Sequence, residues 1–196
     1  MSIIAINGKI GSGKDTVGSF IQQINTDRNW QIKKFAGKLK EVASILSGVS
    51  VDRFEDQEFK KQDMNSCWGM TYRDFLQKIG TEAMRNGLHE NVWVNALFSE
   101  YIVLDDTKRA SMGNVIDYSD CSFPDWIITD LRFANEFDSV KQRRGITVRV
   151  TRPGLTFNNH ISETALDNFQ FDYEIVNDGT LEDLYEKVKK LCEKIC

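Results

Sequence analysis

The chain has 196 residues, of which 41% are hydrophobic and 28% are charged, and its formal net charge is −4. A chain of this size and composition is typical of one globular domain with a well-filled core. The negative charge argues against a protein that coats nucleic acid, and no stretch is long and apolar enough to span a membrane. We therefore expect a cytoplasmic protein that has neither nucleic acid nor a membrane as its partner.

The cysteines and histidines give no sign of a metal site or of a disulfide framework. The four cysteines lack zinc-type spacing and the two histidines stand alone in the sequence, so we expect free thiols in a reducing compartment. Because an apolar strand begins almost at the first residue, we also expect no signal peptide.

Hydrophobic periodicity and turn residues predict an alternation of strands and helices along the chain. In chain order the predicted elements are a strand at about Ile3–Asn7, a helix at Lys14–Ile24, a strand at Trp30–Phe35, helices at Lys38–Leu46, Tyr72–Asn86 and Val92–Tyr101, a strand at Trp126–Thr129, a helix at Ala134–Arg144, strands at Ile146–Val150 and Tyr173–Val176, and a final helix from Thr180. The stretch Asp105–Pro124 has no clear pattern. This alternation is typical of a three-layer α/β fold, a mainly parallel sheet with helices on both faces. We expect residues 1–196 to form a single domain.

A glycine-rich turn lies between the first predicted strand and the first predicted helix. Its spacing, Gly8-x-x-x-x-Gly13-Lys14, matches the phosphate-binding P-loop. The backbone N–H groups of such a turn and the positive end of the following helix bind an anion, and the lysine adds a point charge for the outer phosphates. The alternative is a chance glycine-rich turn. The predicted ATP-binding residues are Gly8, Lys9, Gly11, Ser12, Gly13, Lys14, Asp15 and Thr16.

The position after the P-loop lysine departs from the usual pattern. It is Asp15, where Ser or Thr is usual, and a hydroxyl follows at Thr16. Mg²⁺ prefers oxygen ligands and keeps several waters, so a carboxylate here can hold the ion directly or through water. We predict that Asp15, Thr16 and the more distant Asp130 are the Mg²⁺ ligands.

A second cluster of charged residues follows the apolar stretch Trp126–Thr129. Asp130 stands where a P-loop enzyme places the carboxylate that orders Mg²⁺ and its waters. Arg132 can reach the same phosphates, and Glu136, four residues further on, can pair with it on a helix. We predict Asp130, Arg132 and Glu136 as catalytic residues beside Lys14. The alternative is a surface ion pair, with the aspartate as a helix cap.

Three motifs spread along the chain are similar to those of one enzyme family. They are Ser12-Gly13-Lys14-Asp15-Thr16, Asp130-x-Arg132-Phe133-x-Asn135-Glu136 and His160-x-Ser162-Glu163-x-Ala165-Leu166. In this order they resemble the phage deoxynucleoside monophosphate kinases, and the resemblance extends to Arg73-x-x-x-Gln77-x-x-Gly80-Thr81-Glu82-x-x-Arg85. It fails mainly over Asp105–Pro124. The resemblance implies a P-loop kinase fold and transfer of the γ-phosphoryl of ATP to a deoxynucleoside monophosphate with Mg²⁺, in the host cytoplasm if the protein is phage-encoded.

The predicted helix Tyr72–Asn86 carries polar residues at intervals of four, which places them along one face. Two arginines and two hydrogen-bonding groups on one face suit a phosphate and a base edge. Together with the resemblance, this spacing predicts a helical acceptor region at about residues 38–101, whereas the alternative is a solvated polar face. An aromatic ring beyond this helix can stack on the base, although such a ring is also a common core residue. The predicted substrate-binding residues are Arg73, Gln77, Thr81, Arg85, Trp93 and Arg152.

Two segments near the C-terminal strands contain further candidate residues. Among Arg143, Arg144, Arg149 and Arg152, we select the last as the phosphate contact because it follows the end of a predicted strand. Residues 160–163 are predicted to begin a helix, with a lid or an adenine contact as the alternative.

Other functions and assemblies stay open at this point. A P-loop kinase of another small phosphorylated metabolite, such as dephospho-coenzyme A or phosphomevalonate, is the alternative function. A GTPase-type switch would need an Asn-Lys-x-Asp motif, which the chain lacks. The sequence leaves the accepted bases and the oligomeric state open, and a homodimer is one option.

Overall fold

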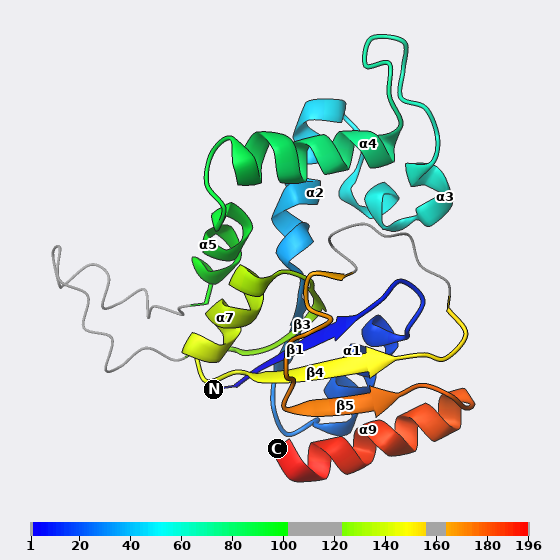
Figure 1. Ribbon diagram of the computed structural model, residues 1–196, viewed down its shortest axis with the longest axis vertical. Helices are drawn as coiled ribbons and strands as arrows, with labels where there is room; N and C mark the ends of the chain where they lie inside the picture. The colour runs from blue at the N-terminus through cyan, green and yellow to red at the C-terminus, as the bar shows by residue number, and fades with distance from the viewer. Residues whose placement is uncertain (1, 102–122, 156–163, 196) are drawn as a thin grey trace, which may run out of the picture. The chain divides into compact units, whose positions relative to one another are not determined.

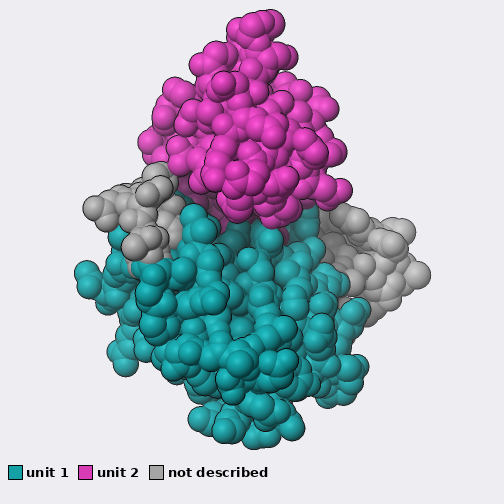
Figure 2. All heavy atoms as spheres, turned by 90° about the vertical axis from the view of Figure 1, so that its right-hand side faces the viewer, with its two compact units in different colours: residues 1–34, 98–196 teal, residues 35–97 magenta. Residues whose placement is uncertain are grey.

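In the computed structural model, residues 2–101, 123–155 and 164–195 are described. They form two compact units, which Figure 2 shows in different colours. Unit 1 comprises Met1–Lys34 and Phe98–Cys196, and unit 2 comprises Phe35–Leu97.

Unit 1 contains a parallel sheet with the strand order β2-β3-β1-β4-β5 (Figure 1). Its strands are β1 (Ile3–Gly8), β2 (Trp30–Lys33), β3 (Asp125–Leu131), β4 (Ile146–Thr151) and β5 (Tyr173–Val176). In a parallel sheet all carboxyl ends lie at one edge, and ligands bind beyond that edge. The predicted parallel α/β sheet is therefore confirmed, with β3 two residues longer at its end than the sequence indicates.

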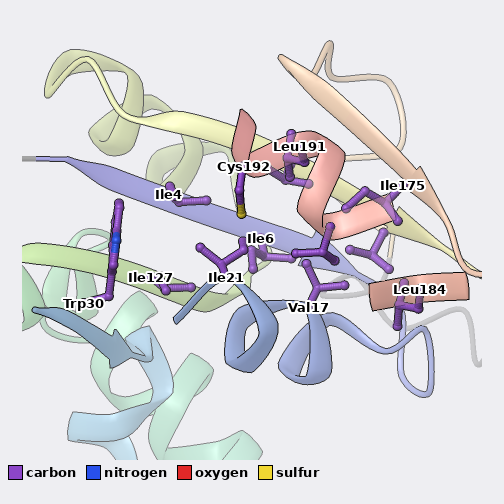
Figure 3. Close-up of a cluster of buried hydrophobic side chains, with 13 residues drawn as sticks. Ile4, Ile6, Val17, Ile21, Trp30, Ile127, Ile175, Leu184, Leu191 and Cys192 are labelled. Atoms are coloured by element: carbon purple, nitrogen blue, oxygen red, sulfur yellow. The ribbon is translucent and has the colours of Figure 1, made fainter. Parts of the chain in front are cut away.

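Helices cover both faces of this sheet. On one face, α1 (Lys14–Ile24) packs against α9 (Leu181–Ile195), and their apolar stripes close over Ile4 and Ile6 of β1 (Figure 3). On the other face, α7 (Ala134–Gln142) contacts β1 and β4. Neighbouring residues of a strand point to opposite faces, so β1, which is buried except at the half-buried Asn7, contributes to both layers. The glycine-rich turn thus follows a largely buried central strand.

Unit 2 is helical and has its own core. Its elements are α2 (Phe35–Ser47), a 3₁₀ turn (Val51–Glu55), α3 (Gln57–Lys60), α4 (Tyr72–Gln77), a π-helix (Lys78–Asn86) and α5 (Val92–Phe98), whose last residue belongs to unit 1. The core gathers Ala43, Phe54, Phe59, Met64, Phe75 and Ile79. The predicted helix Tyr72–Asn86 has the expected bounds, but its second half is a π-helix rather than an α-helix.

Two other observations concern the extent of the chain. Most of the unpatterned stretch Asp105–Pro124 lies outside the described residues, as do residues 160–163. Within the described ranges, no helix combines the length and the apolar character that crossing a membrane requires.

Candidate active site

The glycine-rich turn between β1 and α1 has a backbone that only glycine adopts easily. Gly11 and Gly13 have positive φ angles of 80° and 95°, a region that L-residues with side chains rarely adopt. A Cβ atom at Gly8 would lie 2.3 Å from the Ser12 Oγ and 2.9 Å from the Val150 carbonyl oxygen, and one at Gly13 would lie 2.6 Å from the Asn177 Nδ2. The turn is therefore a closely packed backbone cradle at the N-terminus of α1.

This cradle has the features that a phosphate group needs. The side chain of Ser12 is only 1% exposed, and its hydroxyl has no hydrogen-bond partner among the described residues. Asn177, which follows β5, donates a hydrogen bond from its side-chain amide to the Ser12 carbonyl at 2.9 Å and so stabilises the turn. Lys14 begins α1 and is buried. A buried donor without a partner beside a helix N-terminus fits an anion such as the phosphates of ATP.

The carboxylate of Asp15 is held by two neighbours at one oxygen. The Thr129 hydroxyl donates to Asp15 Oδ1 at 2.9 Å, and Lys34 Nζ lies 3.3 Å from the same atom. Burial alone would raise the pKa of Asp15, but Lys34, the Thr129 hydrogen bond and Lys14 outweigh it and lower the pKa below its ordinary value. Asp15 is therefore an anion at neutral pH, and these contacts leave Oδ2 for a metal ion or its waters.

Asp130 lies within β3, whereas the sequence predicts that it follows the end of that strand. The pairing of β1 with β3 shifts between Ala5 opposite Ile128 and Asn7 opposite Leu131, so β3 has one extra residue there. Such a bulge changes the direction of a side chain and is common beside active sites. Asp130 is buried at this bulge. The prediction that this residue lies past the strand is therefore wrong, because pairing with β1 continues to Leu131.

The carboxylate of Glu136 binds the main chain just before α7, a contact that its predicted pairing with Arg132 does not include. Glu136 is 2% exposed, and its Oε2 accepts hydrogen bonds from the backbone N–H groups of Arg132 and Phe133 at 2.9 and 3.1 Å. A carboxylate at the third helical position that binds backwards in this way caps the N-terminus of α7. Glu136 thus fixes the main chain from which the half-buried Arg132 side chain extends.

The four C-terminal arginines have different surroundings. The Arg149 guanidinium donates to the carbonyl oxygens of Leu166, Asp167 and Phe169, which makes it an anchor for that segment. Arg143 stacks on Phe98 and donates to the Ser139 carbonyl. Arg144, which has a positive φ of 57°, follows the end of α7.

Arg152 lies beside the P-loop and lines a cavity there, and Arg149 lines the same cavity. Arg152 follows the end of β4, and its Nη1 lies 3.5 Å from the Gly11 carbonyl oxygen. The cavity has a volume of about 360 Å³, and Gly8, Lys9 and Ser12 of the turn also line it. Lys9 also approaches Asp167, with 3.5 Å between Nζ and Oδ2. Thr16, the remaining predicted ligand, is half-buried in the first turn of α1.

The predicted acceptor residues lie on the continuous helical segment of unit 2. Arg73 donates to the Gln57 side chain at 3.2 Å, and its buried Nε has no hydrogen-bond partner among the described residues. Gln77 is exposed, whereas Thr81 and Arg85 are half-buried on the π-helix. The guanidinium of the latter lies 3.5 Å from the Glu90 carbonyl oxygen.

Trp93 lies in the packed interior and not on an open face. Its side chain is 5% exposed, and its indole N–H donates to the Gly80 carbonyl oxygen at 2.9 Å. The ring as placed offers little surface to a base, so we assign Trp93 the role of anchoring the π-helix.

Three residues beside the P-loop escaped the sequence analysis: Lys34, Thr129 and Asn177. Lys34 and Asn177 directly follow β2 and β5, and Thr129 lies two residues before the end of β3. Because ligands of parallel sheets bind beyond the carboxyl ends of the strands, the positions of these residues near strand ends were a usable signal. Their pairing with particular P-loop atoms was not, since it depends on the strand order.

Comparison with known proteins relates the chain to one family of kinases. Residues 35–188 match the family model for deoxynucleotide monophosphate kinase. A provisionally named deoxynucleotide monophosphate kinase of Acanthamoeba polyphaga mimivirus is 30% identical, with 96% of this chain and 94% of that protein covered. The deoxynucleotide monophosphate kinase of Escherichia phage RB69 is 27% identical over 66% of this chain, and the match spans only 47% of that enzyme.

A solved structure was also compared with the chain. The shikimate kinase of Acinetobacter baumannii aligns with a TM-score of 0.48 and 17% identity, over 99% of this chain and 94% of that one. The family match begins at residue 35 and therefore does not include the P-loop, so the P-loop geometry and the family match are separate observations. Together they show that the chain belongs to the deoxynucleotide monophosphate kinase family, whose members phosphorylate deoxynucleoside monophosphates with ATP as the phosphate donor.

Proposed function

We propose that the glycine-rich turn of unit 1 holds the phosphates of ATP, and that the transfer of the γ-phosphoryl group to a deoxynucleoside monophosphate depends on Lys14 and Arg132. The observation that carries the proposal is the cradle itself, in which the Ser12 hydroxyl is buried without a partner among the described residues. An unpaired buried donor is costly, so a ligand oxygen at this position accounts for it.

The residues of the cradle have distinct roles in this proposal. The backbone N–H groups of Gly11, Gly13 and Lys14 and the Ser12 hydroxyl donate to phosphate oxygens, and the Lys14 ammonium stabilises the outer phosphates. The Ser12 N–H instead donates to the Lys9 carbonyl at 3.0 Å and closes the turn. Arg152, beside Gly11 at the mouth of the cavity, neutralises a further phosphate oxygen. Phosphoryl transfer needs positioning and positive charge and little covalent chemistry, which suits this set of donors and cations.

The oxygen donors beside the cradle fit Mg²⁺. Asp15, Thr16 and Asp130 offer two carboxylates and a hydroxyl, whereas the described residues contain no group of three or more His, Cys, Asp or Glu that could hold a metal alone. Mg²⁺ is typically bound by one or two carboxylates together with substrate phosphates and waters. When bound, the ion would supply positive charge that neutralises phosphate oxygens.

The acceptor side of the reaction is assigned to unit 2. Arg73, Gln77, Thr81 and Arg85 follow one another along the helical segment, and the first of them has a buried Nε without a partner among the described residues. In the reaction, an oxygen of the acceptor phosphate attacks the γ-phosphorus, the bond to the β-phosphate oxygen breaks, and ADP leaves. Arg132, held by Glu136 through its main chain, stabilises the charge on the transferring group.

A panel of acceptors tests this assignment. The protein is incubated with ATP and Mg²⁺ and with each deoxynucleoside monophosphate, each ribonucleoside monophosphate and dephospho-coenzyme A, and ADP release is measured. We expect ADP release with at least one deoxynucleoside monophosphate and loss of that activity in EDTA. Activity with dephospho-coenzyme A alone would contradict the proposed acceptor, and full activity in EDTA would contradict the metal assignment.

A further inference from the structure

Lys34 is placed beside the P-loop by the register of the sheet. Lys33 of β2 pairs with Ile128 of β3, so the next residues along the two strands are Lys34 and Thr129. Both of these side chains reach Asp15 Oδ1, at 3.3 and 2.9 Å. Three segments that are far apart in the sequence thus converge on one carboxylate oxygen.

The neighbouring lysine is directed elsewhere. Lys33 Nζ lies 3.4 Å from Glu100 Oε2 and 5.1 Å from the centroid of the Trp126 ring. Neighbouring residues of a strand point to opposite faces, which explains why two consecutive lysines have different partners. The chain therefore contains a matched control for the charge of Lys34.

The charge balance of this P-loop needs such a lysine. A Ser or Thr after the P-loop lysine is neutral, whereas Asp15 adds a negative charge in the first turn of α1, at the end of the helix that attracts anions. An ionised carboxylate there repels a polyphosphate, and it competes with the polyphosphate for the same positive field. A cation within ion-pair distance removes much of this repulsion.

We propose that Lys34 is a positioning residue of the nucleotide site, which compensates the negative charge of Asp15 and, together with Thr129, fixes its carboxylate so that nucleotide binds with or without Mg²⁺. This inference rests on the proposed function, because it assumes that the turn binds nucleotide. Lys34 acts here through Asp15 and not by direct contact with phosphate. Its contribution is therefore greatest when no metal ion shares the carboxylate.

The test measures ADP affinity, in EDTA and in saturating Mg²⁺, for the full-length protein without acceptor. Lys34→Met keeps most of the apolar stem and removes the charge. We expect this variant to weaken ADP binding about tenfold in EDTA. In Mg²⁺ we expect a loss of about twofold to threefold, because a metal ion at the carboxylate then compensates part of its charge. Lys34→Arg keeps the charge and restores most of the affinity in EDTA, and Lys33→Met changes neither affinity.

The Asp15→Asn background separates an indirect role from a direct one. If Lys34 acts through the carboxylate, Lys34→Met has little effect once Asp15 is neutral, which is a non-additive double-mutant cycle. An equal loss in both backgrounds and in both metal conditions overturns the proposal and makes Lys34 a direct phosphate ligand. Unchanged ADP affinity in Lys34→Met also overturns it, while the proposed function stands if the unchanged protein binds ADP. Absence of ADP binding by the unchanged, folded protein contradicts the proposed function itself.

Discussion

In unit 1 the candidate residues are held by backbone geometry at strand ends, whereas in unit 2 they lie along a single helical segment. A side chain at Gly8 or Gly13 of this turn would clash with neighbouring atoms, because an added Cβ would lie less than 3.0 Å from them. The polar residues from Arg73 to Arg85 are exposed or half-buried side chains on α4 and the π-helix. The comparison suggests that the donor site is specified by the fold and the acceptor site by side-chain identity.

The largest effect is expected for Arg132 in unit 1. Arg132→Ala should lower kcat by about 10³ or more, since a positioned arginine contributes about 10³–10⁵ in comparable reactions. Arg132→Lys should not restore the rate, because an ammonium group lacks the planar fork of a guanidinium. The measurement is kcat at saturating ATP and acceptor, with the thermal midpoint as a control for folding. A rate within tenfold of that of the unchanged protein would contradict a catalytic role and favour the alternative, in which Arg132 belongs to a surface ion pair.

Glu136 sharpens the same test because its carboxylate binds the main chain of Arg132 and Phe133. Glu136→Gln keeps one acceptor oxygen, so we expect a smaller loss of kcat, about tenfold. The double variant with Arg132→Ala should be little slower than Arg132→Ala alone, because the glutamate acts through the arginine. Multiplicative losses in kcat would show an independent role for Glu136.

Lys14→Ala is expected to have the next largest effect. Removing one preorganised transition-state donor commonly costs about 10²–10³ in kcat, and Lys14 is buried at the start of α1. Because the turn is shaped by its glycines and by Asn177, the fold should survive the change. Steady-state kinetics together with circular dichroism test this. A folded variant that retains more than a tenth of kcat contradicts the assignment.

In unit 2, Arg85→Ala should act on the acceptor and not on ATP. A hydrogen bond to a charged group contributes about 1.5–3 kcal/mol, so KM for the monophosphate should rise about tenfold to a hundredfold. The KM for ATP should stay within twofold, because Arg85 belongs to unit 2 and the P-loop to unit 1. Equal increases in KM for the monophosphate and for ATP would contradict the assignment of the acceptor to unit 2 and of ATP to unit 1.

The P-loop could be predicted because its evidence is local. A strand, glycines that the turn requires and a helix follow one another within a few residues, and their spacing alone predicts the backbone conformation. The contact of Lys34 and Thr129 with Asp15 could not be predicted, because it depends on β3 lying between β2 and β1. The order of the strands along the chain does not reveal which strands are neighbours in the sheet.

Two further differences have local physical causes. The capping role of Glu136 was missed because the N-cap of α7 is Phe133, which does not match the Ser/Thr pattern of a capping box. The π-helix Lys78–Asn86 was missed because the polar spacing of four fits an α-helix about as well as the wider π turn. The extent of the helix was therefore predicted, and its internal geometry was not.

The smallest expected effects come from two glycines of unit 2 that have open space around them. Gly37 lies inside α2, and Gly48 follows the end of α2 with a positive φ of 72°; an added Cβ would meet nothing within 4 Å at either position. Gly37→Ala should stabilise the protein by about 0.5–1 kcal/mol, because alanine loses less backbone entropy in a helix. Gly48→Ala should destabilise it by about 1–2 kcal/mol, because the left-handed conformation strains a residue with a Cβ. Urea unfolding measures both, and KM for ATP should stay unchanged in each variant. A change in KM for ATP in either variant would mean that the backbone of unit 2 also affects the ATP site. That result would contradict the assignment of ATP binding to unit 1 alone.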